Sequence, residues 1–383
     1  MNSTQPLASA FVSKPELIPI SQNERRILHL VRRSRSTTRA ELSRQTQLAA
    51  QSVSRLVDGL IGKKLLAAGA RIQSGRRGQP SIEISLDPAA AYSVGLSVAT
   101  DFVAVSLVDF AGAAVHEAQM TPGSVDRRTV VNLLRDEIDN ACRRYAIPSE
   151  RIFGLGVAIA GFFAGDGEKV NPSSELDDWA LVDIPDYLNS ELGLPVWLEN
   201  DGTAAAIGES LVGVGQWAST FAYLYFARGF GGGLVVDGKP LRGAHGNAGE
   251  FGGMLDPDSP DYPNLEGLRQ LLGEDGHEFA SIHEMVAELD CGWPAVRTWI
   301  ERASKPISRV VTAIATCMDP QAIVFGGEMP RALALELIAS VQIRNTDRRN
   351  RPRPNPRLVA SEKPGSAAPF GAATIPLKSH FFV

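Results

Sequence analysis

The most constraining feature of the sequence is a short apolar run that passes directly into an alanine-rich helix. The apolar run 194–197 is followed by Leu-Glu-Asn-Asp-Gly-Thr-Ala-Ala-Ala-Ile-Gly-Glu over residues 198–209. This order places the amide of Asn200 and the carboxylate of Asp201 at the carboxyl end of a strand, where open α/β sheets hold ligands. Asp is also a favoured N-cap residue, so Asp201 could simply begin the helix, and one carboxylate can do both.

The run 198–209 resembles the signature of the ROK family of repressors, open reading frames and kinases, whose positions it matches in order. The resemblance implies an α/β, two-lobed fold of the actin and hexokinase ATPase type, with a sugar cleft near residues 200–266. In the family's kinases, the aspartate matching Asp201 is the general base that accepts a proton from a sugar hydroxyl. The residue matching Asn200 hydrogen-bonds the sugar.

The charge of the chain is unevenly divided. Residues 1–90 hold 14 Lys and Arg against 6 Asp and Glu, a balance of +8, which leaves 24 against 37, or −13, for residues 91–383. Such asymmetry indicates a nucleic-acid-binding end joined to an acidic body.

The basic end has the pattern of a helix-turn-helix followed by a β-hairpin. Ser-x-x-Glu over 21–24 has the spacing of a capping box, and Thr-x-x-Glu over 38–41 has the same spacing. A third helix is expected over about 50–61. Alternation over 82–86 predicts a strand after a Gly-Arg-Arg-Gly tip. The block resembles the winged helix-turn-helix that precedes the domain in ROK repressors. We therefore predict a flexible tail over 1–20, a winged helix-turn-helix domain over 21–88 and a ROK sugar-kinase-like domain over 89–383.

Five side chains of this block are predicted to contact DNA. Gln51, Ser52 and Arg55 would face the major groove, where Gln suits adenine and Arg suits guanine. Arg76 and Arg77 at the hairpin tip suit a minor groove, whose negative potential attracts guanidinium groups. The alternative is a module that contacts only protein; the basic balance and the arginine tip favour DNA.

The sequence departs from the kinase pattern where the family binds phosphate. A ROK kinase has Gly-x-Asp-x-Gly-Gly-Thr-Lys, and this chain has Gly-Leu-Ser-Val-Ala-Thr-Asp-Phe over 95–102. A carboxylate at this turn would repel phosphate. We therefore expect neither bound ATP nor sugar kinase activity. The replacements that carry this prediction are Ser97, Ala99, Thr100 and Asp101.

Three glutamates complete the predicted ligand site. Glu250 matches the sugar-binding glutamate of the family's Gly-x-Ala-Gly-Glu motif, and Glu266 matches a second sugar contact. Glu175 stands where many members have a sugar-binding Asn. Glu175 is equally well interpreted as a solvated loop residue, and Glu266 as an acidic residue at a helix start. Since segment 253–266 lacks the family's histidine and cysteines, we expect no zinc or other metal there.

The composition of the chain predicts its cellular location and the state of its cysteines. The chain has no apolar run of the ~18 residues needed to span a bilayer, and no secretory signal, so we expect a cytoplasmic protein without membrane contact. Its three cysteines are far apart and are interpreted as free thiols. The arginine-rich segment 344–357 is interpreted as a solvated surface loop, with a second DNA contact as the alternative.

The favoured function is a ligand-responsive transcriptional regulator, a repressor of carbohydrate uptake or catabolism genes. It would bind operator DNA as a homodimer or homotetramer and sense a sugar or polyol in a catalytically inactive cleft. The alternative is an active ATP-dependent sugar kinase with an appended DNA-binding domain, which Asp201 supports. A third interpretation is a ROK-like protein that binds no ligand.

Overall fold

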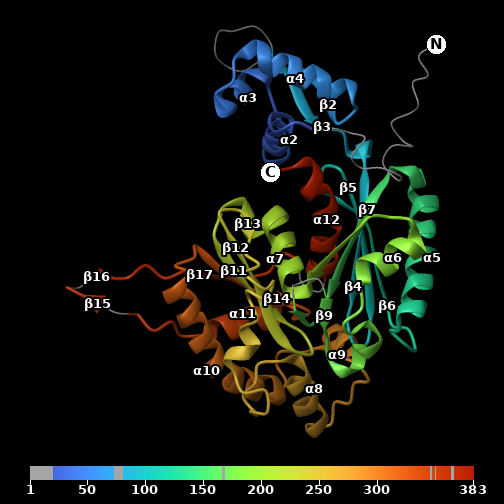
Figure 1. The fold of residues 1–383 in the computed structure, drawn as a ribbon. Helices are drawn as coiled ribbons and strands as arrows, with labels where there is room; N and C mark the ends of the chain where they lie inside the picture. Colours follow the sequence, from blue (N-terminus) through green and yellow to red (C-terminus); the bar gives the residue numbers. More distant parts are fainter. Residues whose placement is uncertain (1–19, 73–80, 166–168, 346, 350, 364–365) are drawn as a thin grey trace.

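The computed structural model describes residues 20–72, 81–165, 169–345, 347–349, 351–363 and 366–383. The described chain forms a small N-terminal head above a body that contains two five-stranded sheets (Figure 1). The predicted tail, apart from Ile20, lies outside the described residues, as do Arg76 and Arg77.

The head packs three helices on a three-stranded antiparallel sheet in the order β1-β3-β2. The predicted capping box is confirmed, because Ser21 and Glu24 each accept a hydrogen bond from the other's backbone N–H. Thr38 caps the second helix through the N–H of Glu41. The elements are α2 Gln22–Ser34, β1 Ser36–Thr37, α3 Arg39–Thr46, α4 Ala50–Gly62, β2 Leu66–Ile72 and β3 Ser81–Leu86.

The first lobe of the body is the sheet β10-β7-β4-β5-β6 with the helices α5 and α6. Strands β4, β7 and β10 are parallel, so their carboxyl ends meet at one edge, whereas β5 and β6 run antiparallel to their neighbours. The bounds are β4 Tyr92–Val98, β5 Val103–Asp109, β6 Ala114–Met120, α5 Arg127–Tyr145, β7 Ile152–Ile159, β8 Phe162–Ala164, β9 Lys169–Asn171, α6 Ile184–Leu192 and β10 Val196–Asn200.

The second lobe is the sheet β13-β12-β11-β14-β17 with the helices α8 to α11. A short ribbon, β15 and β16, extends away from this lobe within the arginine-rich segment (Figure 1). The bounds are β11 Phe221–Phe226, β12 Phe230–Val236, β13 Lys239–Pro240, α8 Leu265–Glu274, α9 Ile282–Glu288, α10 Pro294–Cys317, β14 Ala322–Gly327, α11 Arg331–Ser340, β15 Asp347–Arg348, β16 Arg351–Pro352 and β17 Arg357–Ala360.

Two helices, α7 (Asp201–Val212) and α12 (Ala367–Phe381), lie between the two sheets and pack against each other (Figure 1). A Cβ atom on Gly371 of α12 would lie 1.7 Å from the carbonyl oxygen of Ala204 in α7. On its other side α12 packs on β4, where a Cβ on Gly95 would lie 1.9 Å from the carbonyl oxygen of Pro369. Backbone therefore touches backbone through the centre of the body.

No helix among the described residues is long and apolar enough to cross a membrane.

Replacing Gly371 with Ala is expected to lower the free energy of unfolding by about 3 kcal/mol or more, because the new methyl group forces α7 and α12 apart. The matched control is Gly59→Ala in α4, where a Cβ meets no atom within 4 Å. That control should gain about 0.5–1 kcal/mol from helix propensity. Urea unfolding of both variants provides the measurement, and equal stabilities would contradict the close contact.

Candidate functional site

Asn200 joins three segments at the carboxyl end of the first-lobe strands. It is the last residue of β10 and caps α7, because its side-chain oxygen accepts a hydrogen bond from the N–H of Thr203 at 3.1 Å. Its side-chain nitrogen donates to the carbonyl oxygen of Gly161 at 2.9 Å and to Oε1 of Glu250 at 3.3 Å. The cap function foreseen for Asp201 thus belongs to Asn200, and Asp201 is the first residue of the helix.

Asp201 and Glu250 carry carboxyl groups that are unusually difficult to ionise. Burial raises the pKa of Asp201 to about 6, although the N–H of Gly202 donates to its Oδ1 at 2.8 Å. Glu250 lies in the segment that follows β13 and is exposed as a whole residue, but its carboxyl group is partly enclosed by protein. This desolvation raises the pKa of Glu250 to about 7, and the charge of Asp201 adds to the effect. Asn200, which binds Glu250 through its side chain, directly precedes Asp201, so the two carboxyl groups belong to the same region of the structure.

A third carboxyl group, Glu328, approaches the same place from the second lobe. It directly follows β14, and its pKa is raised to about 8 by burial and then by the charges of Asp101 and Asp201. Glu328 is not among the predicted site residues, although it follows the same pattern as Asp201, a polar residue at the carboxyl end of a strand. Asn200, Asp201, Glu250 and Glu328 are called the carboxylate site below. In the described part of the chain, no group of three or more His, Cys, Asp or Glu side chains is placed to hold a metal.

The segment 241–250, which carries Glu250, is fastened to the first lobe. Arg242 forms an ion pair of 2.7 Å with Glu199, whose carboxylate is buried. Asn247 exchanges two hydrogen bonds with the backbone of Phe163, at 2.7 and 2.8 Å. Sequence reasoning missed Arg242 and Asn247, because both lie far along the chain from their partners.

Glu175 and Glu266, which were predicted to contact the ligand, both have arginine partners. Glu175 lies 3.2 Å from Arg228, which stands in the turn between β11 and β12 and so joins the two lobes. Glu266 forms an ion pair of 2.6 Å with Arg269, and this hydrogen-bonded partner lowers the pKa of Glu266. The sugar-binding role of these two residues stays a prediction.

The turn that would hold phosphate in a kinase lies near side chains of the second lobe. Ser97 is buried in β4, and the N–H of Ala99 donates to the carbonyl oxygen of Phe102 at 3.0 Å. Phe102 is itself buried, with its ring centre 6.4 Å from that of His283 near the start of α9. The charge of Asp101 acts on Arg269 of α8 and on Glu328.

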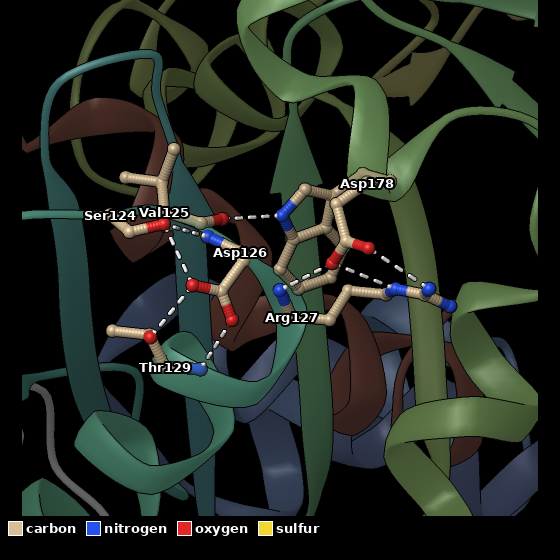
Figure 2. Close-up of polar contacts among 7 residues, drawn as sticks. Ser124, Val125, Asp126, Arg127, Thr129 and Asp178 are labelled. Atoms are coloured by element: carbon tan, nitrogen blue, oxygen red, sulfur yellow. Dashed lines mark hydrogen bonds and ion pairs between the residues drawn. The ribbon is translucent and has the colours of Figure 1, made fainter.

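A pocket of about 350 Å³ opens beside this turn, within the first lobe. Its wall is braced by Asp126, which accepts hydrogen bonds from Ser124 and Thr129, and by Arg127, which binds Asp178 (Figure 2). A second hollow of about 330 Å³ lies between α5 and α6. Neither pocket is lined by a member of the carboxylate site, so the volumes of these two pockets do not locate that site. The first pocket is lined by Thr100, Asp101, residues 122–126 and residues 174–179.

Helix α4, which carries Gln51, Ser52 and Arg55, lies on the side of the head that is away from the two sheets (Figure 1). Gln51 and Arg55 are exposed on α4, and Ser52 is half-buried there. The left-handed residue Gln47 ends α3 and turns the chain into α4.

Comparison with known proteins identifies relatives of the body and of the whole chain. An uncharacterized protein, y4fQ, of Sinorhizobium fredii is 28% identical over 372 residues, which is 96% of this chain and 94% of that protein. The xylose repressor of Caldicellulosiruptor bescii is 27% identical over 233 residues, which is 60% of this chain and 57% of the repressor. The alignment with the repressor thus spans less than two thirds of its length.

Solved structures support the same mixed α/β architecture. A ROK family transcriptional regulator, a homologue of the E. coli MLC protein, has a TM-score of 0.66 and 20% identity, covering 98% of this chain and 96% of its own. A ROK family glucokinase from Streptomyces griseus, in complex with glucose and AMPPNP, has a TM-score of 0.60 and 22% identity. It covers 74% of this chain and 99% of its own. At these identities the likeness concerns the fold.

Residues 93–263 match the sequence profile of the ROK family. The match includes strands β4 to β13 and three of the four members of the carboxylate site. This part of the chain is therefore similar to the ROK family of proteins.

Proposed function

We propose that this chain is a transcriptional regulator, a repressor of carbohydrate uptake or catabolism genes, that responds to a sugar or polyol. The observation that carries the proposal is the extent of the structural likeness. A ROK regulator covers 98% of the chain, including the head, whereas the ROK glucokinase covers 74%. Similarity to a xylose repressor supports the same conclusion.

In this proposal the head, residues 21–88, is a winged helix-turn-helix domain, and residues 89–383 form the sensing domain. Three short helices and a hairpin fit that class of DNA-binding module. Helix α4 would enter the major groove, since Gln51 and Arg55 are exposed on it and suited to base edges. A homodimer or homotetramer would place two heads on one operator.

The carboxylate site would bind the effector. Ionised carboxylates accept hydrogen bonds from hydroxyl groups, and an amide such as that of Asn200 both donates and accepts. Buried charges reduce stability, so Asp201 and Glu328 are costly residues unless they have a role. A polyhydroxylated ligand supplies the donors that these groups need.

The alternative, an active sugar kinase, is favoured by Asp201, whose pKa of about 6 suits a general base. The residues of the phosphate turn fit ATP poorly, because Asp101 adds negative charge and Phe102 is buried under His283. Segment 253–266 also fits a structural zinc ion poorly, since its only candidate ligands are carboxylates. We therefore propose that the chain uses neither ATP nor zinc.

The kinase alternative is tested by a coupled assay with ATP, magnesium and a panel of sugars. We expect turnover no higher than that of the Asp201→Asn variant, because phosphoryl transfer depends on positioned phosphates and charge neutralisation. Turnover that requires Asp201 would overturn the regulator proposal in favour of the kinase.

Replacing both Gln51 and Arg55 with Ala should weaken binding to a DNA fragment from upstream of the gene by about 10-fold or more, since each lost base contact costs ~1–3 kcal/mol. Binding to mixed-sequence duplex should weaken less. The matched control is Arg297→Ala, an exposed arginine on α10 of the body, which should bind as wild type. Equal affinities for all three proteins, measured by fluorescence anisotropy, would remove α4 from the interface.

Sugar affinity should rise with pH between about 5 and 8. Hydroxyl donors favour ionised carboxylates, and the free groups have raised pKa values of about 6 for Asp201 and about 7 for Glu250. At pH 5 the ligand must displace protons, so we expect binding about tenfold or more weaker than at pH 8. Calorimetry with D-xylose and a sugar panel provides the measurement.

The control for this pH series is Asp258→Asn, an exposed loop carboxylate that should leave the profile unchanged. Glu250→Gln should flatten the upper part of the profile. A wild-type affinity that is independent of pH would show that these carboxyl groups do not bind the ligand.

A further inference from the structure

We infer that the C-terminal helix α12 couples the carboxylate site to the head, through a docking contact between its last turn and helix α2. The inference rests on the proposed function and concerns how an effector could alter DNA binding.

At one end, Arg25 of α2 binds the backbone of the C-terminal segment. Its guanidinium group donates to the carbonyl oxygen of Ser379 at 2.8 Å and to that of Phe382 at 2.6 and 3.0 Å. The last carbonyl groups of a helix lack partners within the helix and carry partial negative charge. An arginine with several donors fits this end, and Figure 1 shows α2 beside the end of α12.

Apolar side chains also pack together where α2 meets the C-terminal segment. Ile27 and Leu28 of α2 belong to one hydrophobic core with Phe381 and Phe382. The guanidinium group of Arg32 lies over the ring of Phe382, 5.2 Å from its centre. The head therefore shares its core with the C-terminal segment and is not held by the chain connection alone.

At the other end, α12 meets the carboxylate site through α7. Helix α7 begins at Asp201, and within its second turn the backbone of Ala204 touches Gly371 of α12. Gly208 approaches α12 one turn later, where an added Cβ would lie 3.0 Å from the carbonyl oxygen of Ala367. Since no flexible side chain separates the two helices at Gly371, a shift of α7 displaces α12 directly.

A buried polar network provides a second connection, from Glu328. The N–H of Gly327, its neighbour, donates to the hydroxyl of Tyr223 at 2.8 Å, and that hydroxyl lies 3.4 Å from the hydroxyl of Ser361. Ser361 donates in turn to Glu209 of α7, which also accepts from the N–H of Glu362 at 2.7 Å. Because Glu209 belongs to α7, this network joins the end of β14 to the helix that packs against α12.

The chain offers a matched pair of variants for testing this coupling. Arg25→Ala removes the contact with α12. Arg26→Ala removes the neighbouring arginine, which is exposed and donates only weakly, at 3.4 Å, to Gln45 within the head. Arg25→Lys keeps the charge but loses the forked geometry, so it should give an intermediate result.

The experiment is hydrogen exchange of the full chain with and without a saturating 30-base-pair mixed-sequence duplex at low salt. Because coupling is reciprocal, DNA held by the head should alter exchange in α7 and α12 of the wild type. We expect at least a twofold change in their exchange rates in wild type and in Arg26→Ala, and no change in Arg25→Ala. Exchange of α2 without DNA should be faster in Arg25→Ala than in the other two proteins.

The outcomes separate this inference from the proposed function. A chain that binds no duplex would overturn the proposed function, and this inference with it. DNA binding that leaves α7 and α12 unchanged in the wild type would overturn the inference alone. A response in Arg25→Ala equal to that of the wild type would also overturn it, because the docking contact would then transmit nothing.

Discussion

The structure depends on the backbone contact between α7 and α12. The two helices between the five-stranded sheets touch without intervening side chains, and Gly371 makes that close contact possible. Helix α7 begins at Asp201, directly after its cap Asn200, so the packing of α7 against α12 also positions these two residues. Packing at the centre of the body thus determines the geometry of the candidate site at its edge.

The acidic residues in and around this site fall into two groups, those with an arginine partner and those whose pKa is raised. Glu175, Glu199 and Glu266 each pair with an arginine. The pKa values of Asp201, Glu250 and Glu328, by contrast, are raised mainly by burial. Proteins tolerate such destabilising groups where they bind or react, so the raised pKa values are the physical argument for a ligand site here.

Much of the architecture could be predicted from local signals. Sequence patterns predict three features: the capping box at Ser21, the strand that ends at Asn200 and the alternating strand that ends at Leu86. Each of these features is determined by residues that are neighbours in the chain. The contacts of Arg242 and Asn247 could not be predicted from the sequence, since their partners lie 43 and 84 residues away. Glu328 had a readable signal at a strand end, but its approach to Asp201 required the placement of the second sheet.

Residue types and their order were sufficient to indicate an α/β body, a basic head and a polar strand end holding Asn200 and Asp201. They did so because hydrophobic period, capping and charge are local properties. Only the tertiary structure decided that Glu175 is paired with Arg228, that Glu328 joins the site, and that Arg25 binds the end of α12. These arrangements depend on how distant segments pack, and no single stretch of sequence contains that information.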